Sequence, residues 1–161
     1  MPKENETMAG CDMIANLTRL PGEKPLEGIK IKRAFAGEKM RVLDFIREHF
    51  SEGWVYEAEN ALLQHKCFIA TKANRILGFA CYDATAKGYF GPIGVTEETR
   101  GTGVGTALLL RTLTCMREEG YGYAIIGWVD DAEQFYRKTV NAEWIPGGEP
   151  ENTVYSNLIS M

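Results

Sequence analysis

The chain has 161 residues, of which 45% are hydrophobic and 25% charged, enough for one well-filled core and too few for two ordinary domains. The net charge of -4 and the lack of a basic run argue against a nucleic-acid partner. No apolar stretch approaches the roughly 20 residues that a membrane span needs. We therefore expect one soluble domain with neither a nucleic-acid nor a membrane partner.

The cysteines suggest an intracellular protein. They are widely spaced, without a Cys-x-x-Cys motif, and no apolar leader segment precedes them. Most of them lie in apolar strand or helix patterns, where a free cysteine packs as a small hydrophobic residue. We therefore expect reduced thiols, a cytoplasmic location and no bound metal. The four residues are Cys11, Cys67, Cys81 and Cys115.

The first 26 residues are expected to form an N-terminal extension, partly flexible, because residues 1–10 are polar and the turn sequence Pro21-Gly22 follows. Within this extension, residues 13–17 are predicted to form a short edge strand. The remaining residues, 27–161, are expected to form a single domain.

Strands are predicted in this domain where apolar residues alternate or run together, and helices where they recur every three or four positions. Ser51 is a predicted N-cap. Proline donates no ladder hydrogen bond, so the strand is expected either to bulge at Pro92 or to lack a partner there. The pattern predicts an α+β fold with a mixed sheet. In chain order the elements are a strand (29–33), two helices (40–50, 51–63), three strands (66–72, 76–83, 89–95), a helix (108–116), a strand (123–126), a helix (131–138) and two closing strands (144–145, 154–159).

A glycine-rich loop, Arg100-Gly101-Thr102-Gly103-Val104-Gly105, lies between a predicted strand and a predicted helix. Its glycines allow close backbone approach to a ligand, and the first N–H groups of a helix lack intrahelical partners. These features predict a phosphate-binding loop with a pyrophosphate as ligand. The spacing differs from the dinucleotide fingerprint, and no Gly-Lys-Ser/Thr follows, which argues against nicotinamide and nucleoside-triphosphate cofactors. A helix-start loop without a ligand is the alternative.

The wider pattern combines Val95, Arg100-x-x-Gly103-x-Gly105, a leucine-rich helix, a strand and Ala132-x-x-x-Tyr136-x-Lys138. This combination resembles the GNAT superfamily, the Gcn5-related N-acetyltransferases. The resemblance implies a mostly antiparallel sheet with flanking helices, two splayed central strands and acetyl-coenzyme A (acetyl-CoA) as cofactor. The chain departs from the family at Val129, where an asparagine is common, and at Val140-Asn141-Ala142, which replaces the usual Gly-Phe.

The resemblance also implies roles for individual residues. The main chain at Gly94 and Val95 would lie against the pantetheine arm, with an N–H near Val95 available to an oxyanion. Tyr136 would protonate the departing thiolate, because a phenol with a pKa of about 10 stays protonated at neutral pH; a half-buried aromatic without a catalytic role is the alternative. The residues implied to surround the pyrophosphate are Arg100, Gly101, Thr102, Gly103, Val104, Gly105 and Thr106.

The acceptor side is less defined. In the resembling family the second helical segment walls the acceptor pocket, where aromatic rings and carboxylates suit a cationic amine, although ordinary amphipathic packing explains them equally well. The candidate pocket residues are Trp54, Tyr56, Glu57 and Asp130. No motif selects the general base among Glu57, Glu59, Asp83, Glu97, Glu98, Asp130, His49 and His65.

We therefore predict an N-acetyltransferase that moves an acetyl group from acetyl-CoA to a primary amine of a small molecule or peptide. Transfer is expected to be direct, because Cys67 and Cys81 lie within predicted strands and Cys115 within a predicted helix, so no thiol is placed as a nucleophile. The alternatives are a non-catalytic module that senses acyl-CoA and a structural protein on a decayed scaffold. The sequence leaves open the acceptor and the oligomeric state, a homodimer included.

Overall fold

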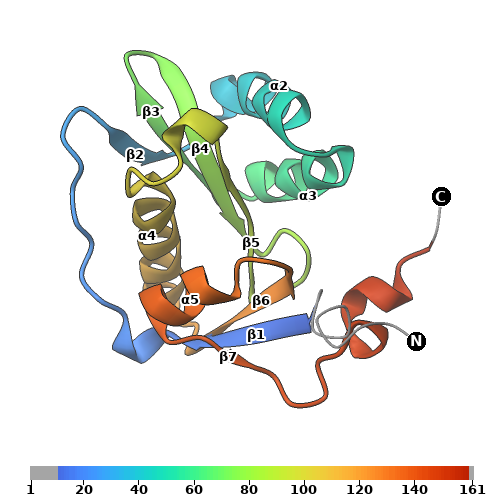
Figure 1. Ribbon diagram of the computed structural model, residues 1–161. Helices are drawn as coiled ribbons and strands as arrows, with labels where there is room; N and C mark the ends of the chain where they lie inside the picture. The colour runs from blue at the N-terminus through green and yellow to red at the C-terminus, as the bar shows by residue number, and fades with distance from the viewer. Residues whose placement is uncertain (1–10, 160–161) are drawn as a thin grey trace.

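Seven strands form one sheet in the computed structural model, which describes residues 11–159 (Figure 1). Their order is β2-β3-β4-β5-β6-β1-β7, and all neighbours run antiparallel except the parallel pair β5 and β6. The mixed, mostly antiparallel sheet confirms the predicted α+β class. The strands are β1 (Cys11–Asn16), β2 (Lys30–Arg33), β3 (Cys67–Lys72), β4 (Arg75–Tyr82), β5 (Tyr89–Val95), β6 (Tyr123–Val129) and β7 (Glu143–Trp144).

Helices cover both faces of the sheet, with α2 and α3 on one side and α4 and α5 on the other (Figure 1). The local signals explain their ends: Ser51 caps α3 by accepting the Trp54 N–H at 3.3 Å, and Gly120, at φ 103°, follows the end of α4. The helices are α2 (Lys39–His49), α3 (Glu52–Leu63), α4 (Val104–Glu118) and α5 (Glu133–Val140). None of the helices between residues 11 and 159 has the length and apolar run required to cross a membrane.

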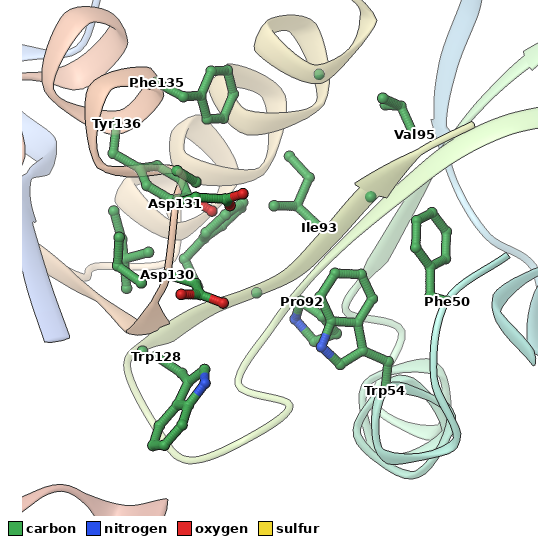
Figure 2. A pocket seen from close by; sticks show the side chains of 18 of the residues that line it. Phe50, Trp54, Pro92, Ile93, Val95, Trp128, Asp130, Asp131, Phe135 and Tyr136 are labelled. Atoms are coloured by element: carbon green, nitrogen blue, oxygen red, sulfur yellow. The ribbon is translucent and has the colours of Figure 1, made fainter. Parts of the chain in front are cut away.

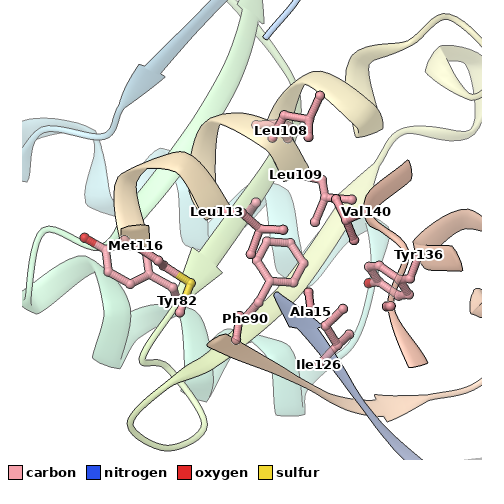
Figure 3. Close-up of a cluster of buried hydrophobic side chains, with 14 of the residues drawn as sticks. Ala15, Tyr82, Phe90, Leu108, Leu109, Leu113, Met116, Ile126, Tyr136 and Val140 are labelled. Carbon is pink, nitrogen blue, oxygen red and sulfur yellow. The ribbon is translucent and has the colours of Figure 1, made fainter. Parts of the chain in front are cut away.

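Two apolar cores lie on opposite faces of the sheet because successive side chains of β3 and β4 point to opposite sides. Cys67, Ile69 and Phe79 pack under α2 and α3. Phe68 and Tyr82 lie on the other face, against α4. Figure 3 shows this second core, where Leu109, Leu113 and Met116 of α4 meet Tyr82, Phe90 and Ile126.

The N-terminal strand β1 is not the edge strand predicted for residues 13–17, because it lies between β6 and β7 and pairs with both. Its partners are far away in the sequence, so the local pattern did not reveal its place. The predicted extension, residues 1–26, therefore contains an interior strand. Residues 1–10 lie outside the described part of the chain. We propose that the domain predicted for residues 27–161 begins at β1.

Residues 154–159 do not form the predicted closing strand. The position beside β6 is taken by β1, and the C-terminal segment folds into two 3-10 turns, η4 (Pro150–Asn152) and η5 (Val154–Asn157). Side-chain hydroxyls stabilise these turns: Thr153 donates to the Pro150 carbonyl at 2.9 Å, and Ser156 donates to the Thr153 carbonyl at 2.8 Å. The apolar residues of the segment suggested a strand, but the segment pairs with no strand of the sheet.

Candidate active site

The parallel strands β5 and β6 pair over a short stretch only, Tyr89 with Ile125 and Phe90 with Ile126. Beyond this point β5 stays paired with β4 up to Val95, while β6 diverges from it. The bulge expected at Pro92 is present, since three steps along β5, from Phe90 to Ile93, face two steps along β4. A cavity of about 1230 Å³ occupies the opening between the two strands.

Figure 2 shows the two walls of this cavity. Phe135 and Tyr136 of α5 lie on one side, Phe50 and Trp54 on the other, and Ile93 of β5 lies between them. The glycine-rich loop closes one end of the cavity, and η5 contributes Tyr155 to its lining. Segments distant in the sequence therefore converge where β5 and β6 separate.

The backbone of β5 offers a hydrogen-bond donor to this cavity. The Thr96 N–H donates to the Leu77 carbonyl at 2.9 Å, which makes these two residues a hydrogen-bonded pair. Bonded and non-bonded pairs alternate along antiparallel strands, so the N–H of Val95 points away from β4, toward the open side. By the same alternation the Gly94 N–H points to β4. The main chain therefore presents Val95, and not Gly94, as the donor.

Gly94 has a different reason to be a glycine. A Cβ at this position would lie 2.6 Å from Cζ of Phe50. The Phe50 ring is fixed in place by Phe79 and Trp54, whose ring centroids lie 5.7 and 5.1 Å away. Glycine in a strand interior is a signal for such close approach. The family resemblance named Gly94 for the pantetheine arm, and the contact with Phe50 was not predicted.

The glycine-rich loop presents a set of free backbone donors. Gly101 and Gly103 have φ angles of 80° and 91°, a region that favours glycine, and Gly103 caps α4 without a side-chain acceptor. Unsatisfied N–H groups at a helix start bind anions. Within residues 11–159, no hydrogen-bond acceptor is present for the N–H groups of Gly101, Gly103, Val104, Gly105 and Thr106.

The residues of the loop differ in their position relative to the cavity. Arg100 is exposed. The loop residues that line the cavity are Arg100, Gly101, Gly103, Gly105 and Thr106. Thr102 does not line it: its N–H and its hydroxyl both donate to the Thr99 carbonyl, which stabilises the turn. The Val104 side chain is fully buried in the core. The predicted phosphate contacts are therefore best supported for the main chain of this loop and for Arg100.

Tyr136 is 6% exposed, and its ring packs edge-on against Phe90 at a centroid distance of 6.3 Å. The residue lines the cavity, and no group of the described chain bonds to its hydroxyl, which opens onto the cavity because no buried side-chain oxygen there lacks a partner. Burial of the ring raises the pKa of this phenol further above its ordinary value of 10. The hydroxyl therefore stays protonated and available to a ligand.

The wall of the cavity that α3 forms contains a partly buried carboxylate. Glu57 on α3 lines it and accepts a hydrogen bond from the Thr85 hydroxyl. Burial raises the pKa of Glu57 above its ordinary value, and the bond from Thr85 partly offsets this effect. Trp54 also lines the cavity, whereas Tyr56 points outward from α3 and is 60% exposed. Asp130 lies at the end of β6 and is exposed.

The cavity reduces the set of candidate bases. Asp83 is bound to Lys66 at 2.8 Å and to the Tyr121 hydroxyl, and it does not line the cavity. Of the eight candidates, only Glu57 and Asp130 line it. The other five are exposed at other parts of the surface: Glu59, Glu97, Glu98, His49 and His65.

Several lining residues were not predicted from the sequence, among them Thr85, Trp128 and Tyr155. Trp128 has a positive φ of 51°, and its N–H donates to the buried carboxylate of Asp12 at 3.0 Å, so β1 fixes the end of β6. The Trp128 ring packs edge-on against Tyr155 at 5.3 Å. These contacts depend on the interior position of β1 and on the 3-10 turn of η5, and neither has a local signature.

Comparison with known proteins agrees with this geometry. Residues 64–139, slightly less than half of the chain, match the family model of the acetyltransferase (GNAT) domain. The matched stretch contains β3 to β6, the glycine-rich loop, α4 and most of α5. A search of curated proteins gives no match.

Solved structures show the same fold. The chain is similar to a GCN5-related N-acetyltransferase from Sphaerobacter thermophilus (TM-score 0.67, 19% identity, covering 85% of this chain and 49% of that one). It is similar to a GCN5-related glucosamine N-acetyltransferase region of a fungal multi-domain GH3 beta-N-acetylglucosaminidase (TM-score 0.66, 15% identity, covering 84% of this chain and 20% of that one). It is also similar to a GNAT family N-acetyltransferase from Escherichia coli in complex with CoA (TM-score 0.50, 17% identity, covering 63% of this chain and 63% of that one). The chain therefore spans 20% to 63% of the length of these structures.

Proposed function

Because this chain carries the acetyltransferase domain of the GNAT superfamily, we propose that it transfers the acetyl group of acetyl-CoA to a primary amine. The observation that carries this proposal is the cavity between β5 and β6. The groups that line this cavity are the free backbone donors of the glycine-rich loop, the Val95 N–H, the Tyr136 phenol and the carboxylate of Glu57. We infer a small-molecule or peptide amine as the acceptor. The cytoplasmic location remains a prediction.

The glycine-rich loop would bind the pyrophosphate of the coenzyme. Its N–H groups from Gly103 to Thr106 point out of the helix start and carry partial positive charge, and Arg100 adds a full charge. The coenzyme itself supplies the activated thioester. The pantetheine arm would then follow the open edge of β5 toward Val95.

Three groups of the chain would carry the chemistry. The amine nitrogen attacks the thioester carbonyl, the C–N bond forms and the C–S bond breaks, without an acyl-enzyme. The Val95 N–H would stabilise negative charge on the carbonyl oxygen. Tyr136 would donate a proton to the departing sulfur, and the second proton that the nitrogen loses as the amide forms would restore the phenol. Glu57 would accept the proton of the ammonium, a role helped by the burial that raises its pKa.

One observation favours a second candidate, a non-catalytic acyl-CoA sensor. Val129, where the resembling family commonly has an asparagine, is 2% exposed and aliphatic, so it places no polar group beside the sulfur. The sensor would use the same loop and cavity but would not turn over its ligand.

Calorimetry with CoA, followed by thiol release and mass spectrometry of products over a panel of primary amines, tests the proposal. Binding, thiol release and an acetylated amine support the acetyltransferase. Tight binding with no thiol release for any amine supports the sensor. If CoA neither binds nor raises the melting temperature, both functions are excluded.

A further inference from the structure

The charged side chains that line the cavity are unevenly distributed. Among residues 11–159, Arg100 is the only lysine, arginine or histidine in the lining, and it belongs to the glycine-rich loop. The carboxylates of Glu57, Asp130 and Asp131 line the remainder. Figure 2 shows Asp130 and Asp131 on one side of the cleft, opposite Trp54 and Phe50. The part of the cavity away from the loop, which we call the acceptor end, is therefore acidic.

Aromatic rings also line the acceptor end. Phe50 and Trp54 pack together at a centroid distance of 5.1 Å on one wall. Trp128 and Tyr155 pack edge-on at 5.3 Å on another. The faces of such rings attract cations, so they add to the effect of the carboxylates.

A separate observation indicates that a polar ligand group enters this cavity. The Tyr136 side chain is more than nine-tenths buried and lines the cavity. No group of the described chain bonds to its hydroxyl, and no buried side-chain oxygen among these residues lacks a partner, so this hydroxyl opens onto the cavity. A hydroxyl in such a position normally has a hydrogen-bond partner. A ligand that reaches the point where α5 meets β5 would supply the missing partner.

We propose that the acceptor is an amine with no carboxylate or phosphate beside its amino group, such as an alkylamine, an arylalkylamine or a polyamine. An α-amino acid would bring its carboxylate close to Glu57, Asp130 and Asp131, where no cation of the described chain faces it. Like charges in such a site disfavour binding strongly. This inference rests on the proposed function, because it concerns the amine side of the same cavity.

Matched pairs that differ only in the carboxylate test the proposal: tyramine and tyrosine, cadaverine and lysine, agmatine and arginine. Two quantities are measured for each pair, kcat/KM with acetyl-CoA and Kd for the CoA-loaded chain. We expect the decarboxylated member to be preferred by on the order of tenfold or more in both. Equal values, or a preference for the amino acid, would overturn the proposal.

The two measurements separate this inference from the proposed function. If decarboxylated amines bind preferentially but none is acetylated, the acetyltransferase proposal fails and the inference stands. If neither member of any pair binds or is acetylated while CoA binds, the inference is overturned.

A charge variant links the preference to Glu57. Glu57→Gln keeps the shape of the side chain and an acceptor for the Thr85 hydroxyl. We expect the Kd ratio within each pair to fall by about threefold or more, a binding readout that does not depend on a role as a base. Glu59→Gln is the control, because Glu59 lies on the same helix, is 53% exposed and contacts Lys39 at 3.9 Å outside the cavity. If the Kd ratio within each pair were unchanged in Glu57→Gln, Glu57 would not be a source of the preference for decarboxylated amines.

Discussion

Thr85 donates a hydrogen bond to the carboxylate of Glu57, and so joins the loop after β4 to the middle of α3. This bond holds in place the only carboxylate of α3 that lines the cavity. It also stabilises the charged form of Glu57 and works against the burial that raises its pKa. Burial is the larger effect, and the bond lowers the pH at which Glu57 becomes a base.

Thr85→Val should move the pH profile of activity. Valine has nearly the same shape but no hydroxyl, so the pKa of Glu57 rises further. The acidic limb of kcat/KM, which reports the free enzyme, should shift to higher pH. Thr114→Val is the control, because Thr114 of α4 does not line the cavity. An unshifted acidic limb in Thr85→Val would show that Glu57 is not the titrating base.

Glu57→Gln should change stability and activity in opposite directions at neutral pH. Burial holds the folded pKa of Glu57 above its ordinary 4.5, so the folded chain binds more protons than the unfolded chain between these values. The stability contributed by Glu57 is therefore complete below 4.5 and is lost as pH rises through the folded pKa. The difference in Tm, variant minus wild type, should be larger at about pH 8 than at about pH 4, because only the wild type carries the buried charge at pH 8. A difference that decreases as pH rises would mean that folding favours the charged form of Glu57.

Tyr136→Phe should separate chemistry from coenzyme binding. Loss of a general acid typically costs about 10²- to 10⁴-fold in rate, and kcat should fall within this range while the Kd of CoA stays the same. Tyr123→Phe on β6 is the control, because Tyr123 is 59% exposed and lies outside the cavity. Because burial raises the pKa of Tyr136, no alkaline loss of activity should arise from it near pH 10. A kcat equal to that of the control would exclude the acid role.

Gly103→Ala should weaken coenzyme binding. The residue has a φ of 91°, where a Cβ is strained by about 1–3 kcal/mol, so the loop should shift and misplace its N–H groups. Calorimetry should show a higher Kd for CoA. Gly37→Ala is the control, since a Cβ there meets no atom within 4 Å and Gly37 lies outside the cavity. Equal CoA affinity in both variants would remove the loop from the binding site.

Gly94→Ala should destabilise the fold through Phe50. The added methyl collides with a ring held by Trp54 and Phe79, and overpacking of this kind costs about 1–3 kcal/mol. A double-mutant cycle with Phe50→Leu measures the coupling by denaturant unfolding. The loss in the double variant should be smaller than the sum of the two single losses. Additive losses would show that the two positions do not meet.

Local signals in the sequence predicted the elements with strong periodicity. The Ser51 cap, the meander from β3 to β5 and the bulge at Pro92 all depend on neighbouring residues, and the structure confirms them. The interior place of β1 depends on pairing with β6, more than a hundred residues later, which no local pattern encodes. The C-terminal turn η5 was mistaken for a strand for the same reason.

The candidate site also combines a part that local sequence predicted with a part that depends on long-range contacts. The glycine-rich loop is contiguous and was recognised from its own residues, whereas the acceptor end is assembled from several segments. Thr85, Trp128 and Tyr155 reach it only through tertiary contacts. Eight candidate bases became two when the cavity was located, and Tyr56 proved to be exposed and outside the cavity that Glu57 lines.

A crystal structure of this chain with acetyl-CoA tests most directly whether the opening between β5 and β6 is the coenzyme site. We predict the pyrophosphate within hydrogen-bond distance of the N–H groups from Gly103 to Thr106, and the thioester oxygen at the Val95 N–H. A coenzyme bound outside this opening, or a thioester that does not reach Val95, would contradict the account.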